Sequence, residues 1–318
     1  MVVPCHNYGR YLRTCLDSVF AQTIPRERVE IIAVDDASTD ESPEILAEYA
    51  GRGVIVLTEP VNRGYVRAYR RGMALASGRL LLPLDADDLI ADEDAIRSQV
   101  AMIDASDRIG FVHSTCYEVD ATGRRLRVRP AWEHSGVYRS EQAFRKLLTG
   151  NSVQHTGTLM RRDAYVAVGG YDEALRNSVD WDLWLRLSRW YDVGFIDRPL
   201  YAYRLHGANM HQRVTETREE RELVHAEMFT VIDQATADRP RRERRHAYAE
   251  ARLLLANAHL SNFRTRDGVR SLGQAIRLHP PVTARVAFWA AIGRLALRAV
   301  IGRRGYDFIR ARARSSGG

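Results

Sequence analysis

The stretch Leu80-Leu-Leu-Pro-Leu84-Asp85-Ala86-Asp87-Asp88 places three carboxylates directly after an apolar run. The run has the length and composition of a buried β-strand. Three acidic side chains within four residues repel one another and destabilise the fold unless a cation compensates them. Carboxylate oxygens suit a hard divalent ion such as Mg²⁺ or Mn²⁺, held together with a substrate phosphate. The stretch therefore predicts a metal site at the end of a strand. For Asp87 and Asp88 alone, the alternative is the acidic first turn of a helix near residue 93.

The segments around this stretch alternate between strand-like and helix-like patterns. The strand-like runs cover 29–34, 54–57, 80–84 and 109–113. The segments that indicate helices cover about 10–22, 42–50, 64–76 and 93–104. This alternation, with nearly continuous apolar strands, predicts an α/β fold with a mostly parallel sheet flanked by helices. Ligands of such sheets bind at the carboxyl ends of the strands, so the loops after these runs are the candidates for a site.

The composition excludes several classes of protein. Of the 318 residues, 45% are hydrophobic and 27% are charged, which excludes a disordered chain. The three cysteines form no CxxC pair, which excludes a disulfide scaffold and a cysteine-rich zinc site. The opening Met1-Val-Val-Pro-Cys-His lacks a secretory signal pattern, and no window of about 18 uncharged apolar residues indicates a membrane-spanning helix. We therefore expect a cytoplasmic protein.

The charge divides the chain into two parts. Residues 1–211 carry a net charge of −3, and residues 212–318 carry +10. Residues 216–280 show helical patterns without strand signals, so the α/β part is followed by an α-helical extension. We expect three regions: an α/β domain at 1–211, a helical extension at 212–281 and an amphipathic basic tail at 282–318.

The tail has the pattern of an amphipathic helix. Its apolar residues recur at helical spacing on one face, at Phe288, Ile292, Leu295 and Ala299. Arginines lie opposite that face and follow it. This pattern is typical of a helix that lies on an anionic membrane, here the inner face of the cell membrane. The alternative is that the apolar face packs on the 216–280 helices. Nucleic-acid binding is not expected, because no recognition motif accompanies the arginines.

Further polar side chains stand where a site is expected. Asp36 ends a strand-like run and can accept hydrogen bonds from a base or ribose. Asp180 and Asp182 begin an amphipathic helix, where the helix dipole explains one of them and a general base would explain the other. His206 follows the strand-like run 193–196. Within the loops expected at 114–160, the suspects for contact with an acceptor or a sugar are Trp132, Asn151, His155 and Thr156.

Several motifs, in their order and spacing, resemble family 2 glycosyltransferases with the GT-A fold over about residues 2–210. The motifs that carry the resemblance are Val3-Pro-Cys-His-Asn7, Glu30-Ile-Ile-Ala-Val-Asp-Asp-Ala-Ser-Thr-Asp40, Asn62-Arg-Gly64, Asp85-Ala-Asp87-Asp88, Gly169-Gly-Tyr-Asp172-Glu173 and Asp180-Trp-Asp-Leu-Trp-Leu-Arg186. The resemblance does not extend into 216–318. It implies a Rossmann-like GT-A domain and inverting transfer of a sugar from a nucleotide-diphospho-sugar.

The resemblance also implies a role for individual residues. Those assigned to the nucleotide-sugar are Pro4, His6, Asn7, Asp36, Arg63 and Asp85. Asp87 and His206 are expected to hold Mn²⁺ or Mg²⁺, and Asp180 is expected to be the general base. Trp181 and Asp182, beside that base, join Trp132, Asn151 and His155 on the acceptor or sugar side.

Two positions depart from the family pattern. His6 stands where the family usually has an aromatic residue, and Val179 replaces the Glu of the Glu-Asp pair that contains the base. Because Asp180 itself is retained, we expect activity with a different support or orientation of the base. Only three residues precede Pro4, fewer than a central strand normally needs, so we expect that the natural start lies upstream or that a few residues are missing.

The sequence therefore predicts an inverting, metal-dependent transferase acting on a hydroxyl of a glycan or lipid-linked acceptor. Two alternatives stay open. A nucleotidyltransferase would normally need a Gly-rich phosphate loop with Lys or Arg near the first strand, and Pro4–Tyr11 is not one. A non-catalytic sugar-nucleotide-binding protein would suit the basic tail but has no need of Asp180.

Overall fold

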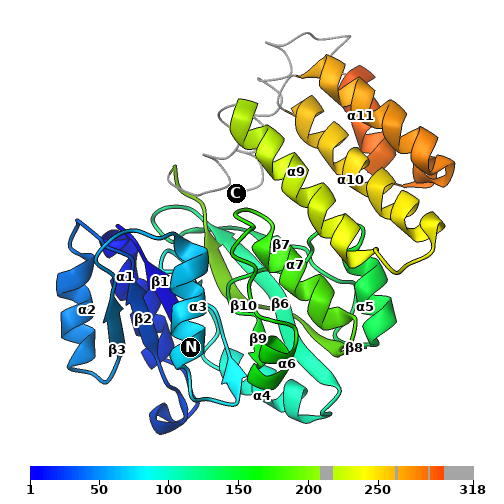
Figure 1. Cartoon of the computed structure of the whole chain (residues 1–318). Helices are drawn as coiled ribbons and strands as arrows, with labels where there is room; N and C mark the ends of the chain where they lie inside the picture. The colour runs from blue at the N-terminus through cyan, green and yellow to red at the C-terminus, as the bar shows by residue number, and fades with distance from the viewer. Residues whose placement is uncertain (208–217, 262–263, 286, 297–318) are drawn as a thin grey trace. The chain divides into compact units, whose positions relative to one another are not determined.

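The computed structural model describes four stretches of the chain: 1–207, 218–261, 264–285 and 287–296. The chain forms two compact units (Figure 1). One unit consists of Met1–Leu147 with Asn151–Arg221, and the other of Leu148–Gly150 with the chain from Glu222 onward. The boundary expected at 211–212 lies outside the described residues and stays a prediction.

The first sheet is parallel and aligns the carboxyl ends of its three strands. In the order β1-β2-β3 the strands are β1 (Val2–Cys5), β2 (Ile32–Asp35) and β3 (Ile55–Thr58). Cys5 pairs with Asp35, and Asp35 pairs with Thr58, so the strands end at one level. The loops that follow them therefore meet at one edge of the sheet.

Three helices connect the strands of this region, at the positions that the sequence predicted: α1 (Gly9–Phe20), α2 (Ser42–Ala50) and α3 (Tyr65–Leu75). Helix α3 packs on β1 and β2. Gly72 permits this close approach, because a Cβ atom at this position would collide with the side chain of Val2. The packing fixes the start of α3 relative to the strand ends.

The second sheet is mixed. Its main path, β4-β9-β6-β10-β5, contains β4 (Leu80–Leu81), β9 (Leu159–Arg161), β6 (Ile109–Val119), β10 (Asp192–Arg204) and β5 (Leu89–Ile90). Strand β7 (Arg125–Arg129) pairs with β6, and β8 (Gly136–Tyr138) pairs with β10. Only the long β6–β10 pair in this sheet is parallel among the described strands. The expected α/β class holds, but the parallel part is limited to the first sheet and a few further pairings.

Backbone hydrogen bonds join the two sheets beside the acidic stretch. The Val2 N–H donates to the Leu82 carbonyl oxygen at 2.9 Å, and the Leu84 N–H donates to the Val2 carbonyl oxygen at 3.0 Å. The run 80–84 therefore continues as the neighbour of β1, and Asp85 follows it at the same edge as the ends of β1 and β2. This pairing places the acidic stretch where the sequence predicted a site.

The remaining helices of this unit are α4 (Ala95–Asp104), α5 (Ser140–Leu147), α6 (Arg162–Ala167) and α7 (Val179–Ser188). Because β5 separates the acidic stretch from α4, Asp87 and Asp88 do not form the first turn of a helix, and that alternative is wrong. The region 114–160, expected as loops, contains the end of β6, strands β7 and β8, and α5. Its polar segments carry too little periodicity to reveal these short elements.

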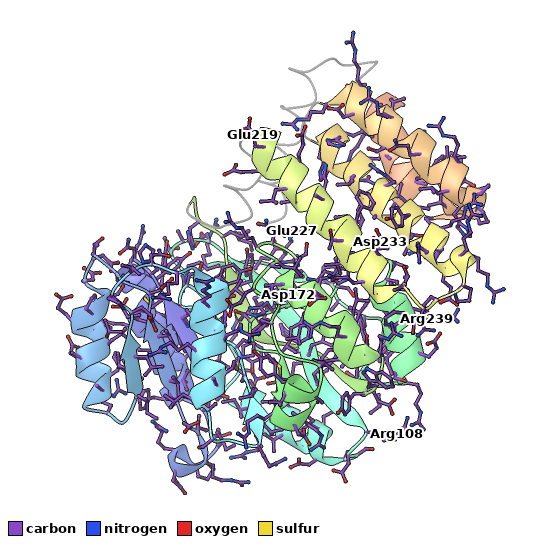
Figure 2. The ribbon with its side chains drawn as sticks, in the orientation of Figure 1. Arg108, Asp172, Glu219, Glu227, Asp233 and Arg239 are labelled. Atoms are coloured by element: carbon purple, nitrogen blue, oxygen red, sulfur yellow. The ribbon has the colours of Figure 1, made fainter. Side chains whose placement is uncertain are left out.

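The second unit is helical, as expected from 216–280. It comprises α9 (Arg218–Ala235) from Glu222 onward, α10 (Arg241–Ser261), α11 (Thr265–Leu278), the 3₁₀ helix η2 (Pro280–Ala284) and a helix over 287–296. Helices α10 and α11 pack against each other. Asp233 of α9, labelled in Figure 2, accepts a hydrogen bond from the Tyr248 hydroxyl of α10; the distance is 2.8 Å.

The apolar face expected to enter a membrane is instead part of the helical core. Phe288 is buried, and Ile292 and Leu295 pack against the same cluster of α10 and α11 residues. Arg294 donates a hydrogen bond to Asn257 Oδ1 of α10 at 2.7 Å. The alternative of packing is therefore correct for 287–296, while Ala299 and the arginines from 298 onward lie outside the described residues. No helix within the described stretches is long and apolar enough to cross a membrane.

A buried histidine lies in the core of the α/β unit. His113 of β6 is fully buried, and neither ring nitrogen has a hydrogen-bond partner in the described part of the chain. The ring packs against Trp132 and Phe195, with centroids 4.5 and 4.9 Å away. Burial, with the nearby charge of Lys146, lowers the pKa of His113 to about 3. The folded protein therefore holds this ring neutral.

His113 should make folding sensitive to acid. The unfolded chain protonates this ring below about pH 6.5, whereas the folded chain resists protonation until about pH 3, so stability falls as the pH drops through this window. At pH 5 the loss relative to pH 8 is about 2 kcal/mol. We expect His113→Phe to remove that share of the pH dependence in urea unfolding at pH 5 and 8. The exposed His134→Gln serves as the control, and an unchanged pH dependence in His113→Phe would contradict the assignment.

Candidate active site

The turns that follow β1 and β2 hold each other in place. His6 Nδ1 donates to the Asp36 carbonyl oxygen at 2.7 Å. Asn7 adopts φ 59°, a left-handed conformation that asparagine tolerates. In that conformation its side-chain oxygen accepts the Thr39 N–H at 2.8 Å, and its own N–H donates to Ser38 Oγ at 3.0 Å. His6 and Asn7 therefore shape the strand-end surface expected to hold the nucleotide.

Asp36 organises the turn that precedes α3. Its two carboxylate oxygens accept the N–H groups of Arg63 at 2.8 Å and Gly64 at 2.7 Å. Asp36 and Arg63 also line an open groove of about 760 Å³ along β3 and α3. Pro4 is buried within β1, in register with Val34. The carboxylate of Asp36 thus fixes the backbone of Arg63, and both residues line the groove.

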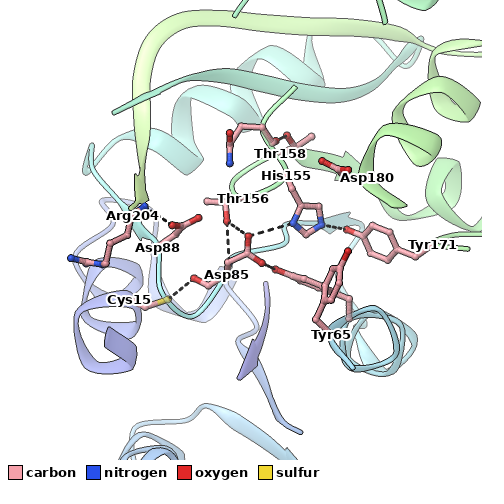
Figure 3. Close-up of polar contacts among 12 residues, drawn as sticks. Cys15, Tyr65, Asp85, Asp88, His155, Thr156, Thr158, Tyr171, Asp180 and Arg204 are labelled. Carbon is pink, nitrogen blue, oxygen red and sulfur yellow. Dashed lines mark hydrogen bonds and ion pairs between the residues drawn. The ribbon is translucent and has the colours of Figure 1, made fainter. Parts of the chain in front are cut away.

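Asp85 is held by side chains from two distant segments. Its carboxylate accepts hydrogen bonds from the hydroxyls of Tyr69 at 2.7 Å and Thr156 at 2.8 Å, and His155 Nδ1 lies 3.6 Å away (Figure 3). Burial opposes ionisation of Asp85, but the hydrogen bond and charge of His155, with the two hydroxyls, outweigh it and lower the pKa of Asp85. The same pairing raises the pKa of His155 against the effect of burial. This first carboxylate is therefore held ionised and fixed in orientation.

Asp87 and Asp88 contact the end of β10. His206 Nε2 lies 2.9 Å from Asp87 Oδ2, and its ring stacks on Tyr11 with centroids 4.9 Å apart. The Arg204 N–H donates to Asp88 Oδ1 at 2.8 Å. Burial and the charge of Asp85 raise the pKa of Asp87, although the hydrogen bond of His206 opposes this. Burial and the charges of both other aspartates raise the pKa of Asp88 well above its usual range.

The residues at this turn fit a divalent cation. Asp87 and His206 offer one oxygen and one nitrogen at hydrogen-bond distance from each other, and the buried Asp88 Oδ2 has no partner within the described residues. A cation would relieve the repulsion that raises the pKa of Asp87. The described residues do not supply three clustered side-chain ligands. Substrate phosphate and water would therefore complete the coordination, as is usual for Mg²⁺.

His155 links the acidic turn to the loop that precedes α7. Its Nε2 lies 2.9 Å from the hydroxyl of the fully buried Tyr171. Arginines from two helices bind the carbonyl groups around Tyr171: Arg70 of α3 contacts the Tyr171 oxygen, and Arg186 of α7 donates to the Gly170 oxygen at 2.7 Å. Figure 3 shows Asp180 beside His155 and Tyr171. The loop is thus clamped between α3 and α7.

Asp180 lies in the first turn of α7. One carboxylate oxygen accepts the Trp181 N–H at 2.8 Å, and the other accepts the Asn151 side-chain N–H at 2.8 Å. Asn151 is exposed and Asp180 is half-buried. The structure therefore brings Asn151 and Asp180 together and presents the carboxylate at the side of His155.

Asp182 has a different environment from Asp180. It is buried and forms an ion pair with Arg186, whose guanidinium also donates to the Val168 and Gly170 oxygens at 2.5 and 2.7 Å. Burial raises the pKa of Asp182, and Arg186 opposes this. Through Arg186, Asp182 anchors the loop before α7. Its expected place on the acceptor or sugar side stays a prediction.

Both tryptophans expected on the acceptor side are buried. The Trp132 indole N–H donates to Ser152 Oγ at 2.8 Å, and the Trp181 indole N–H donates to the Leu147 oxygen at 2.8 Å. Each residue is 4% exposed, so both side chains pack in the interior. Trp132 supports the segment that contains Asn151 and His155. The expected place of the two tryptophans on the acceptor or sugar side stays a prediction.

Tyr69 and Arg204 belong to the site but escaped the sequence analysis. Tyr69 occupies the buried face of α3, where an aromatic residue indicates only core packing. Arg204 is buried at the end of β10. Its Nε donates to the backbone carbonyl oxygen of Asp87 at 2.7 Å, and its guanidinium lies over the Tyr11 ring. Arg204 could have been suspected from the sequence, because it is a charged residue two positions before the candidate His206. Nothing in the sequence around Tyr69 indicated a role in the site.

A match to a known family accompanies this geometry. Residues 1–169 match the model of Glycosyl transferase family 2, which covers more than half of the chain. This chain belongs to glycosyl transferase family 2. The resemblance expected from its motifs is confirmed.

Three curated relatives illustrate the similarity, and all three are bacterial. Chondroitin synthase from Escherichia coli is 27% identical over 208 residues, which are 65% of this chain and 29% of that protein. The poly(ribitol-phosphate) beta-glucosyltransferase of Bacillus spizizenii is 40% identical over 100 residues, 30% of this chain and 16% of that protein. A PGL/p-HBAD biosynthesis glycosyltransferase from Mycobacterium bovis is 29% identical over 189 residues, 58% and 68% of the two chains. The chain spans less than a third of the first two relatives.

Solved structures share the fold. S. aureus TarS superposes with a TM-score of 0.64 at 18% identity, covering 92% of this chain and 52% of that one. The mannosyltransferase PcManGT from Pyrobaculum calidifontis, in complex with GDP-Man and Mn²⁺, gives a TM-score of 0.54 at 17% identity, covering 93% and 85%. The expected GT-A fold class with a helical C-terminal region is confirmed.

The two acidic residues of α7 should separate stability from activity. Asp182→Asn removes the charge that holds Arg186 and the loop carbonyls, and we expect a loss of about 2 kcal/mol in the free energy of unfolding. Asp180→Asn should change that free energy by less than about 0.5 kcal/mol, since its side chain is half-buried and hydrogen-bonded at the rim. Urea unfolding of the two variants measures both. Equal stabilities would contradict the anchor role of Asp182.

Proposed function

We propose that the chain is an inverting glycosyltransferase that moves a sugar from a nucleotide-diphospho-sugar to a hydroxyl of a glycan or lipid-linked acceptor, with a divalent metal. One observation carries this proposal. The Asp85–Asp88 turn and Asp180 come from distant parts of the sequence, yet His155 contacts the first and lies beside the second (Figure 3). Asp85 and Asp87, for the donor, and Asp180, for the acceptor, then belong to a single site.

The donor half of the site is the edge formed by the first sheet. His6, Asn7 and Asp36 shape the surface for the nucleoside, and Arg63 stands at the groove that continues it. Pro4 contributes from within β1 by fixing the start of the first turn. Asp85, held ionised by its partners, faces the ribose or diphosphate.

Asp87 and His206 would hold Mn²⁺ or Mg²⁺ at the diphosphate. When bound, the cation neutralises the negative charge that develops on the departing nucleoside diphosphate. Asp87 and His206 are already in contact and need no large rearrangement. Tyr11 and Tyr8 pack on the His206 ring and keep its orientation.

Asp180 would act as the general base. An acceptor hydroxyl is a poor nucleophile at neutral pH, so a carboxylate must take its proton as the new bond forms. Attack from the face opposite the departing diphosphate inverts the anomeric configuration. The rigid start of α7 and the clamp of Arg186 on the preceding loop keep Asp180 in place, which supports catalysis by positioning.

The relatives indicate which substrates to examine first. TarS has been solved with UDP-GlcNAc and PcManGT with GDP-Man, which makes UDP- and GDP-sugars the first donors to test. The names chondroitin synthase and poly(ribitol-phosphate) beta-glucosyltransferase make chondroitin and poly(ribitol-phosphate) the first polymers to test as acceptors. A thermal-shift screen of sugar nucleotides with and without Mn²⁺ would identify the donor.

The location proposed for the chain is cytoplasmic. Contact with the inner face of the cell membrane would have to use surfaces other than Phe288, Ile292 and Leu295, because these pack in the helical core. The exposed Trp289 is one such surface residue. No role in nucleic-acid binding is proposed.

Asp180→Asn tests the base. We expect this variant to bind donor normally and to lose transfer by about 10²–10⁴-fold, because the amide cannot accept the proton. Calorimetry measures donor binding, and release of nucleoside diphosphate measures turnover, with water as the acceptor until the natural one is known. Asp182→Asn is the matched variant. If Asp182→Asn proved inactive while fully folded Asp180→Asn retained activity, the assignment would be reversed.

Asp87→Asn tests the metal. We expect the variant to fold normally and to lose at least about tenfold in the donor affinity that depends on Mn²⁺, because one of its charged ligands is gone. Calorimetry with the donor selected by the screen, with and without Mn²⁺, gives this difference. Asp107→Asn, on a fully exposed carboxylate, is the control. Unchanged metal-dependent affinity in Asp87→Asn would refute the metal assignment.

A further inference from the structure

Asn151 contacts the carboxylate proposed as the base more directly than any other side chain among the described residues. Its side-chain nitrogen donates to Asp180 Oδ2 at 2.8 Å, while its own side-chain oxygen accepts the Val153 N–H at 3.3 Å. Because the oxygen is engaged by a backbone donor, the amide can only turn its nitrogen toward Asp180. The orientation of the amide therefore follows from the fold of its own loop.

The other oxygen of Asp180 is fixed by its own helix. Oδ1 accepts the Trp181 N–H at 2.8 Å, so each carboxylate oxygen has one donor. Without Asn151 the carboxylate would keep one hydrogen bond and could rotate about its last side-chain bond. With both bonds, the carboxylate is held at both oxygens.

The position before the base offers no such support. Val179 is apolar and 2% exposed, so it can neither donate to Asp180 nor orient it through a hydrogen bond. The segment 151–156 supplies what position 179 lacks. Val153 is buried, Ser152 accepts the Trp132 indole N–H, and the Thr158 hydroxyl donates to the Gln154 oxygen at 2.6 Å. The exposed Asn151 is thus carried by an anchored backbone.

The same segment also reaches the donor half of the site. His155 and Thr156 bind Asp85, four and five residues after Asn151 binds Asp180. The distance between the two carboxylates is therefore fixed by one short stretch of chain. This stretch would therefore also set the distance between a donor bound at Asp85 and an acceptor hydroxyl bound at Asp180.

We propose that Asn151 is a positioning residue that orients the Asp180 carboxylate for proton removal, in place of support from position 179. This inference rests on the proposed function of Asp180 as the base. Asn151 itself does not touch the reacting atoms in this role. It acts through Asp180 and leaves donor binding unchanged.

The test combines single and double variants. We expect Asn151→Ala to lower kcat by about 10- to 100-fold with the donor KM within about twofold, since a misplaced reacting group costs about this much. Asn151→Asp keeps the size of the side chain but places a like charge beside Asp180, so its kcat should be lower still. Gln154→Ala, which removes an amide of the same segment that contacts Arg129, is the control and should retain the wild-type kcat.

The double variant separates positioning from other roles. In the Asp180→Asn background, Asn151→Ala should have no further effect on the residual rate, because residues that act through one another are not additive. An equal fold-loss in both backgrounds, or a rise in acceptor KM at constant kcat, would overturn the inference and indicate direct contact with the acceptor. An active Asp180→Asn would refute the proposed base instead, whereas an inactive Asp180→Asn with a fully active Asn151→Ala would refute only the role of Asn151.

Discussion

The repulsion among Asp85, Asp87 and Asp88 is the constraint on which the rest of the catalytic unit depends. Three carboxylates within one turn must each find compensation, and they find it in parts of the chain that are distant in sequence. Asp85 is satisfied by α3 and the segment 151–156, and the other two by the end of β10. The turn can adopt this geometry only when those elements are already packed. The repulsion among the three carboxylates thereby makes the donor site depend on the folding of the whole α/β unit.

The start of α7 illustrates how one helix turn separates two similar side chains. Residues two apart on a helix project about 200° from each other, so Asp180 and Asp182 cannot share an environment. One faces the rim of the site, and the other is buried against Arg186 one turn later. Arg186 in turn holds the loop that brings Tyr171 to His155. The buried member of the pair therefore stabilises the surroundings in which the half-buried member can act.

The sequence predicted the parts of the fold that depend on local periodicity. The helices α1 to α3 and the strand ends at Asp36 and Asp85 follow from apolar runs and polar loops, and the acidic turn follows from charge density alone. The short strands β7 and β8 were missed because pairing with β6 and β10, not local pattern, stabilises them. The burial of Trp132 and Trp181 was not predicted, because composition does not reveal which face of an aromatic ring is covered. For the same reason the apolar face of 287–296 was compatible with both a membrane and a protein core.

The departure at Val179 shows why a site cannot be transferred from a family pattern residue by residue. Val179 is 2% exposed, and burying a charge at such a position is costly unless the charge is paired and hydrogen-bonded. A glutamate at this position would therefore need a partner of its own. In this chain the Asp180 carboxylate is supported from across the site, by a segment that the Trp132 indole and the Thr158 hydroxyl anchor. The base and the donor carboxylate are consequently tied to the same six residues, so a change in that segment alters both halves of the site together.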